Sequence, residues 1–230
     1  MKYEEFKAFM KRSQSREYMT APKPEKDLSF EDIRARVFYR VDSYKGNESK
    51  LMHCPYIPFH DMVITFRWLF EENEEGICSA LIENRHMEYW GISEEEVIRQ
   101  AVLNTPKLFP YKQTALVKMM SDMGEDFPEG FPADFPIQIL TNEIGINGAS
   151  VVLYEGVLGK AFHEIGEDFY LLPSSIHEML AIGESFVYDP RDLYEMVKEA
   201  NDTVVTEKDY LSGSVYFYDH AKDRMILVPK

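Results

Sequence analysis

The sequence predicts an α+β fold: a mixed, largely antiparallel sheet with helices packed on it. Three segments predict it, namely an apolar hairpin pattern over residues 61–82, a strand-rich segment over 137–180, and a closing hairpin pattern over 214–228. Helical patterns are interleaved with these hairpins and do not alternate with single strands. This order favours an antiparallel sheet over a doubly wound parallel one.

The first 41 residues predict a helix, a linker and an ambiguous stretch. Residues 3–18 carry apolar side chains at helical spacing, within a predicted N-terminal helix over 1–20. The prolines of residues 20–24 end it and form a short linker. Ser29, with Asp32 three residues later, predicts a second helix start. Residues 33–41 fit a helix or a strand equally well.

Residues 61–82 predict a hairpin. The run DMVITFRWLF is rich in β-branched and aromatic residues, and residues 77–82 form the second apolar run. The acidic residues between the two runs lack the regular spacing of a calcium-binding loop. A solvated turn is therefore the favoured interpretation of this acidic tip.

Two helices are predicted next. Ser93 and Glu96 form a capping box, and Pro106 is expected to end the helix that they open. Its expected buried face consists of Val97, Ile98, Ala101 and Val102. A further helix is expected over 111–123, with a Met-rich buried face made of Leu116, Val117, Met119 and Met120.

Three Phe-Pro pairs follow, at a spacing of four residues, and begin with Phe127, Phe131 and Phe135. Proline fixes φ and removes a backbone donor, so residues 124–136 are expected to form a loop. The rings either anchor this loop to the core or form a lid or a partner-binding strip. The loop would join two possible sub-lobes, 30–123 and 137–230, of a single α+β domain over 21–230.

The remaining chain predicts alternating strands and helices. Asn147-Gly148 is a tight-turn signal between two expected strands, a helix should end near Gly166, and another strand runs to Pro173. Asp189-Pro190 predicts the start of a helix that continues to Ala200.

The amino-acid composition disfavours several classes of function. The formal net charge is −15, from 40 acidic and 25 basic residues. This balance disfavours a nucleic-acid partner and an anionic membrane surface. No segment reaches the about 20 apolar residues of a membrane helix, and the N-terminus lacks the apolar run of a signal peptide. With only Cys54 and Cys78, expected as free thiols, a cytoplasmic protein is predicted.

Ser174, Ser175, His177 and Glu178 are the residue types of a hydrolytic site, and Asn142 could line one pocket with them. However, the G-x-S-x-G turn is missing, and neighbouring residues seldom meet triad geometry. The favoured interpretation is that a serine caps the following turn while Glu178 accepts nearby donors.

Two segments begin like zinc-protease helices, at His163 and at His177, but neither has the second histidine four residues later. No metal and no cofactor are therefore predicted.

A series of motifs resembles a family. PYIPFHDMV is followed by WGISEEE, LTN from Leu140, GA from Gly148, LY from Leu153 and LPSSIHE from Leu172. Over residues 36–228 these motifs resemble an uncharacterised bacterial family, the domain of unknown function number 5688. The resemblance supports the fold prediction and implies no known activity, substrate or catalytic residue.

Two hypotheses from different classes remain. The favoured one is a non-catalytic interaction or regulatory protein with a protein partner and no enzymatic activity. Its expected binding residues are Asn142, Ser175, His177, Phe127, Phe131 and Phe135. The alternative is a hydrolase-like enzyme that uses the Ser/His/Glu cluster at 174–178.

Overall fold

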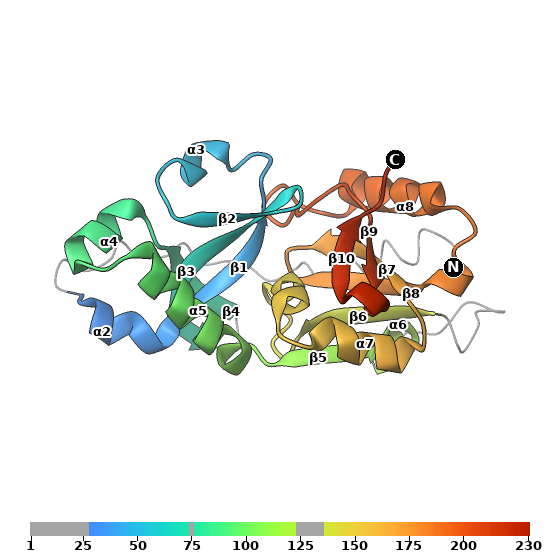
Figure 1. The fold of residues 1–230 in the computed structure, drawn as a ribbon, viewed down its shortest axis with the longest axis horizontal. Helices are drawn as coiled ribbons and strands as arrows, with labels where there is room; N and C mark the ends of the chain where they lie inside the picture. The colour runs from blue at the N-terminus through green and yellow to red at the C-terminus, as the bar shows by residue number, and fades with distance from the viewer. Residues whose placement is uncertain (1–27, 74–75, 123–135) are drawn as a thin grey trace. The chain divides into compact units, whose positions relative to one another are not determined.

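The computed structural model describes residues 28–73, 76–122 and 136–230. The predicted N-terminal helix over 1–20 and the three phenylalanines of the Phe-Pro segment lie outside these residues. By its internal contacts the chain divides into two compact units, with the boundary after Pro110 (Figure 1). The described part of the first unit is 28–73 with 76–110, and that of the second is 111–122 with 136–230.

The first unit is built on a four-stranded sheet around the long strand β3 (Met62–Asn73). β1 (Val37–Ser43) pairs with one edge of β3, while β2 (Tyr56–Phe59) and β4 (Gly76–Leu81) pair with successive halves of the other edge. All these pairings are antiparallel. The hairpin predicted over 61–82 is confirmed as β3 and β4.

Helices cover this sheet. They are α2 (Phe30–Ile33), a 3₁₀ turn (Arg34–Arg36), α3 (Glu48–Leu51), α4 (Asn84–Trp90) and α5 (Glu94–Leu108). α5 packs on β1, where the Thr105 hydroxyl accepts the backbone N–H of Tyr39 at 3.0 Å. Asn104 donates to the carbonyls of Arg34 and Val37 and so fixes the start of β1.

The structure resolves or corrects three expectations in this unit. The ambiguous stretch 33–41 is the end of a helix followed by β1, and the cap at Ser29 and Asp32 is confirmed. Pro106 does not end α5, which continues to Leu108. Pro106 has no N–H to donate to the carbonyl of Val102, four residues earlier. The Val102 side chain is exposed and not buried as predicted, so this carbonyl lies on the solvent side of the helix.

The second unit contains a six-stranded sheet in the order β10-β9-β7-β8-β6-β5. The strands are β5 (Tyr111–Ala115), β6 (Ile137–Asn142), β7 (Phe169–Ser175), β8 (Glu178–Gly183), β9 (Tyr216–Asp219) and β10 (Arg224–Leu227). Every pairing is antiparallel, so the predicted α+β class with a largely antiparallel sheet is confirmed, as two sheets.

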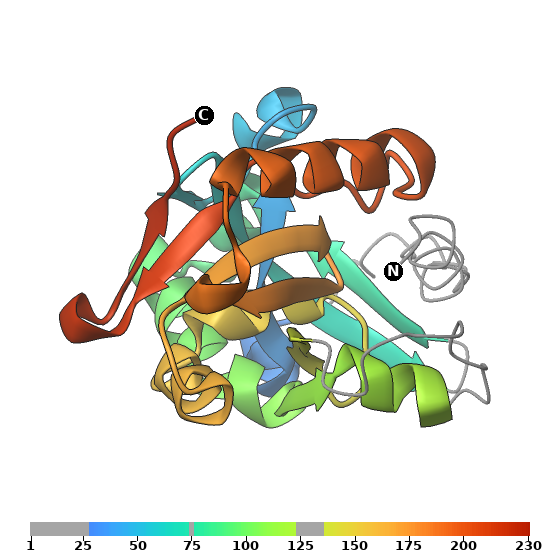
Figure 2. The same ribbon diagram turned by 90° about the vertical axis from the view of Figure 1, so that its right-hand side faces the viewer.

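The helices of this unit are α6 (Leu116–Asp122), α7 (Val157–Ile165) and α8 (Pro190–Thr203), with 3₁₀ turns at Gly148–Leu153, Glu184–Phe186 and His220–Lys222. Figure 2, in which this unit faces the viewer, shows α8 lying across the sheet. Its buried residues Leu193, Val197 and Ala200 share one core cluster with β6, β7 and β8. The Asp189 cap of α8, the end of α7 at Gly166 and the closing hairpin are confirmed.

Two predictions in the second unit are wrong. Residues 111–115 form a strand and not the start of a helix, because Tyr111–Ala115 pair with β6, and helix begins only at Leu116. The strand expected after Asn147-Gly148 is a 3₁₀ turn packed against β6 and β8. In both places, pairing and packing with distant residues override the local pattern.

Candidate functional site

The segment after Pro173 forms a tight hairpin between β7 and β8, with Ile176 and His177 at its turn. The Ser175 hydroxyl oxygen accepts the N–H of His177 at 3.0 Å, and the Ile176 N–H donates to the carbonyl of Asp209 at 2.9 Å. Ser175 therefore stabilises the turn, and this turn presents the His177 side chain to residues far away in the sequence.

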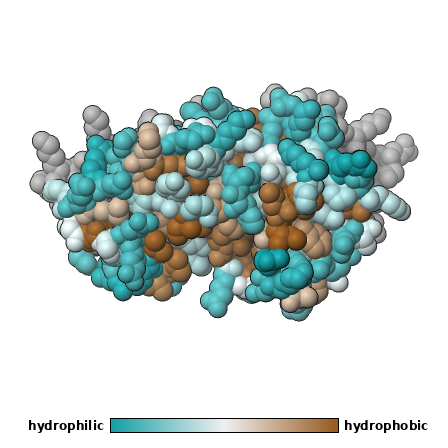
Figure 3. Space-filling model, turned by 45° about the horizontal axis from the view of Figure 1, so that its top comes forward, coloured by the Kyte–Doolittle hydropathy of each residue, from teal (hydrophilic) through white to brown (hydrophobic). Residues whose placement is uncertain are grey.

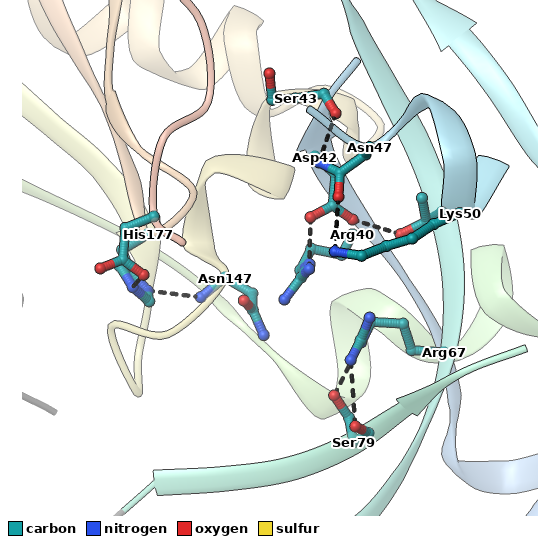
Figure 4. Close-up of polar contacts among 11 residues, drawn as sticks. Arg40, Asp42, Ser43, Asn47, Lys50, Arg67, Ser79, Asn147 and His177 are labelled. Carbon is teal, nitrogen blue, oxygen red and sulfur yellow. Dashed lines mark hydrogen bonds and ion pairs between the residues drawn. The ribbon is translucent and has the colours of Figure 1, made fainter. Parts of the chain in front are cut away.

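Both nitrogens of the His177 imidazole are engaged. Nδ1 accepts the backbone N–H of Asn147 at 3.2 Å, as Figure 4 shows. Nε2 lies 3.3 Å from Asp209 Oδ1, and the other carboxylate oxygen of Asp209 accepts the Thr206 hydroxyl at 2.7 Å. Because Nδ1 accepts a hydrogen bond, the tautomer that fits carries its proton on Nε2 and donates it to Asp209. The imidazole thus joins three segments.

Ser174 and Glu178 form the second contact of the hairpin. The Ser174 hydroxyl donates to Glu178 Oε1 at 3.0 Å. Burial raises the pKa of Glu178, although the hydrogen bond from the Ser174 hydroxyl and the electrostatic influence of His177 act in the opposite direction. Ser174, Ser175, His177 and Glu178 are between 2% and 6% exposed. The predicted hydrolytic residues are therefore brought together, but inside the hairpin and out of reach of bulk water.

Glu178→Gln is expected to be more stable than the wild type at pH 7. A carboxyl whose folded pKa lies above its unfolded value of 4.5 gives stability that is present below pH 4.5 and is lost as pH rises through the folded pKa. Glutamine keeps an oxygen that accepts the Ser174 hydroxyl and has no charge to bury. Urea unfolding at pH 4 and pH 7, followed by circular dichroism, checks this: the advantage should be present only at pH 7. A wild type more stable than the variant at pH 7 would contradict it.

Asn142 is 1% exposed and organises the turn after β6. Its Oδ1 accepts the N–H of Gly145 at 2.8 Å, and its Nδ2 donates to the carbonyl of Ile146 at 2.8 Å. The adjacent Thr141 hydroxyl donates to the carbonyl of His177 at 2.8 Å. The segment of Asn142 and the 174–178 hairpin thus do meet, but through hydrogen bonds that hold backbone in place.

Two further histidines, one from a zinc-protease-like segment and one from the motif PYIPFHDMV, are placed as follows. His163 is exposed on α7. His60 has φ 56° at the two-residue turn between β2 and β3. Among the described residues no three His, Cys, Asp or Glu side chains gather as metal ligands would, and no helix has the length and apolar character needed to cross a bilayer. Phe127, Phe131 and Phe135 lie outside the described residues.

A second polar cluster lies on one face of the sheet of the first unit, and the sequence analysis missed it. We call it the arginine row: Arg40 and Asp42 on β1, Thr65 and Arg67 on β3, and Ser79 on β4 (Figure 4). Arg40 pairs in register with Thr65, and Leu69, two residues after Arg67, pairs with Ser79. Side chains of paired residues share a face, and every second residue of a strand returns to it, so all five project to one side.

Asp42 is the centre of this row. Its Oδ1 accepts Arg40 Nη2 at 2.5 Å, and its Oδ2 accepts the Thr65 hydroxyl at 2.5 Å. Burial alone would raise the pKa of Asp42, but Arg40, with smaller contributions from Arg67 and Thr65, holds it below its usual value. Asp42 is therefore a charged carboxylate in a buried position.

The signal for this row is present in the sequence. VFYRVDS is an apolar run with charges at two alternate positions, Arg40 and Asp42, and MVITFRWLF is an apolar run with one charge, Arg67. A charged residue in an otherwise buried strand is unusual unless it is paired or functional. Arg40 and Asp42 fall on one face only because residues 37–43 form a strand, and the local pattern of 33–41 fits a helix equally well.

Comparison with known proteins gives one match. The model of a family described as a family of unknown function (DUF5688) matches residues 4–220, so it also spans the N-terminal residues that the quoted motifs left out. No curated protein and no solved structure matches the chain.

Proposed function

We propose that this chain, which belongs to the DUF5688 family of unknown function, is a non-catalytic cytoplasmic protein that binds a partner protein. The observation that carries the proposal is an exposed aromatic pair, Phe186 and Tyr188, on the connection between β8 and α8. Phe186 is 59% exposed and Tyr188 is fully exposed. The intervening Val187 packs against the core cluster, whereas the rings on either side of it are exposed to solvent.

The segment that carries the pair is held firmly. The Ser185 N–H and hydroxyl donate to the two carboxylate oxygens of Glu167, at 3.1 and 2.6 Å. The Val187 N–H donates to the carbonyl of Glu184 at 3.1 Å, and Asp189 caps α8 directly afterwards. A pre-organised aromatic pair loses little entropy on binding, which is what a contact surface requires.

Charge around the pair indicates the partner's chemistry. Residues 184–192 contain three acids, Glu184, Asp189 and Asp192, against one base, Arg191, and the chain carries −15 overall. Arg and Lys side chains can form ion pairs with the acids and cation–π contacts with the faces of the rings. The partner is therefore a protein that presents a basic segment.

The other exposed apolar side chains are not part of the proposed contact surface. Figure 3 shows apolar side chains in small groups among hydrophilic ones on the face that it draws. Exposed apolar residues of this kind are ordinary on protein surfaces. Tyr89, which is 66% exposed on α4, is one of them and serves as a matched control.

The proposed cytoplasmic location is supported by the state of the two cysteines. Cys54 and Cys78 are both buried, and neither forms a disulfide. Free thiols persist in a reducing compartment, whereas exported proteins tend to pair them.

The test is capture of partners from lysate of the native host, followed by chemical cross-linking to identify the contacting segment. We expect a partner that the wild type and Tyr89→Ser retain and that the Phe186→Ser/Tyr188→Ser double variant loses at least tenfold, cross-linked through a basic segment. A partner that binds the double variant equally well, or one cross-linked through an acidic segment, would overturn the assignment to this pair.

Two further experiments test the alternative contact surface and the enzyme hypothesis. A triple variant with Phe127, Phe131 and Phe135 changed to Ser tests the Phe-Pro segment, and loss of the partner in this variant alone would move the contact surface there. A broad hydrolase screen of the wild type and Ser175→Ala tests the enzyme hypothesis. Turnover that disappears with Ser175→Ala would overturn the non-catalytic proposal.

A further inference from the structure

Helix α4 is held less firmly than the other helices of the first unit. Among the α-helices in the described part of this unit, it is the one with no buried residue. It has only seven residues, and helices this short are marginal by themselves in water. The position of α4 therefore depends on its caps and on a few side-chain contacts, and this makes it the element of the unit that opens most easily.

His86 provides the N-terminal cap of α4. Its Nδ1 accepts the backbone N–H of Glu83, the N-cap residue, at 3.0 Å. Histidine here takes the place that glutamate or glutamine holds in an ordinary capping box. Because Nδ1 needs a free lone pair to accept this N–H, the cap forms only with the neutral imidazole.

The same imidazole belongs to an aromatic cluster that joins α4 to β3. The His86 ring lies 5.2 Å from that of Trp68 on β3 and 5.5 Å from that of Trp90, measured between ring centroids. Trp68 is 0% exposed, and Trp90 is the last residue of α4. The Trp90 Nε1 donates to the carbonyl of Leu28 at 2.8 Å. His86 thus stands between the cap of α4 and the contacts that hold this helix to β3 and to Leu28.

Few charges act on this imidazole. Burial lowers the pKa of His86 below its usual 6.5; of its charged neighbours, Glu83 raises this pKa and Arg85 lowers it. The rings that extend the cluster from β3 and α2 are uncharged, namely Phe70 and Phe30. The charged side chains of α2 and of the turn after it contact other partners: Glu31 contacts Arg34, Asp32 contacts Ser29, and Arg36 contacts the carbonyls of Asp32 and Phe70.

We propose that His86 is a pH-sensitive switch: when its imidazole takes up a proton, the cap opens and α4 loosens from β3 and from Leu28. Both nitrogens of a protonated imidazole are donors, so Nδ1 would face the Glu83 N–H donor to donor. Opening would also admit water to the Trp68 Nε1, which is buried without an acceptor among the described residues. Buried donors of this kind are costly to leave unpaired.

The direction of the pH dependence follows from the pKa of His86. The folded pKa lies below the unfolded value of 6.5. The contribution of the neutral imidazole to stability is therefore present above pH 6.5 and is lost as pH falls through the folded pKa.

The experiment is hydrogen exchange of the full chain between about pH 8 and pH 5, corrected for the intrinsic exchange rates. We expect peptides that cover residues 83–91 to lose protection at least tenfold on acidification, with a midpoint below pH 6.5, whereas peptides from β1 stay protected. Tryptophan emission should shift to longer wavelength over the same pH range, because Trp90 becomes exposed to water.

Matched variants assign the transition. His86→Gln should keep residues 83–91 protected throughout, since glutamine caps a helix at this position and does not titrate. His86→Ala should leave them unprotected at every pH, and if it does not fold, the glutamine variant decides alone. His163→Gln, which changes an exposed histidine on α7, should keep the wild-type transition. A transition that survives in His86→Gln, or a wild type that is equally or better protected in acid, would overturn the proposal.

Discussion

Replacing Asp42 with alanine is expected to lower the free energy of unfolding of the first unit by about 3–5 kcal/mol. The change removes the carboxylate that Arg40 and Thr65 contact, and it leaves two guanidinium groups side by side in a mostly buried place. Breaking a buried ion pair costs more than the pair contributes, because the remaining charge loses its compensation. Urea unfolding followed by tryptophan fluorescence measures the effect, since both tryptophans, Trp68 and Trp90, lie in this unit.

The loss should depend on pH in one direction. The folded pKa of Asp42 lies below its usual 3.8, so its contribution is present above pH 3.8 and is lost as pH falls through the folded pKa. The difference between wild type and variant should therefore shrink in acid. Glu31→Ala is the matched control, because it removes a carboxylate of a more exposed ion pair, with Arg34, and should change stability by less than about 1 kcal/mol. An equal loss in the control, or none in Asp42→Ala, would show that the arginine row does not depend on Asp42.

Gly148→Ala is the second large effect, with an expected loss of about 3 kcal/mol in the second unit. A Cβ at this position would lie within 3.0 Å of Thr141 Oγ1 and of the carbonyl of His177, the two atoms of one hydrogen bond. Neither can move without separating the turn after β6 from the 174–178 hairpin. Unfolding followed by circular dichroism gives the loss, and hydrogen exchange of peptides from 169–183 should show faster exchange near His177.

Gly159→Ala is the matched control for Gly148. Gly159 lies inside α7, and the nearest atom to an added Cβ is the Tyr218 hydroxyl at 4.0 Å. Alanine should there stabilise the helix by about 0.5–1 kcal/mol, because glycine loses more backbone entropy on folding. If both substitutions were tolerated equally, the close packing around Gly148 would not matter for stability.

The two polar clusters have different chemical character. In the 174–178 hairpin, His177 and Glu178 have partners inside the same unit, Asp209 and Ser174. In the arginine row, Asp42 accepts hydrogen bonds from Arg40 and Thr65, and Arg67 donates to Ser79, so charged side chains from two strands are held on one sheet face.

Much of the fold could be predicted from sequence because its signals are local. β3 and β4 followed from apolar runs around an acidic tip, α5 from Ser93, and α8 from Asp189-Pro190. The end of α5 could not be predicted, because a proline is tolerated where the carbonyl it leaves unpaired faces water. Tyr111–Ala115 was mistaken for helix because its partner, β6, is 22 or more residues away.

The sequence by itself determined the α+β class, the antiparallel hairpins and the caps of the helices, because each depends on residues within a few positions of one another. Only the tertiary structure decided what the polar residues do. It buried Ser174, Ser175, His177 and Glu178 in a hairpin held by Asn147 and Asp209, and it placed Arg40, Asp42 and Arg67 on one face of a sheet. The charge and hydrogen bonding of a side chain depend on neighbours that folding brings from distant segments, and spacing along the chain does not reveal them.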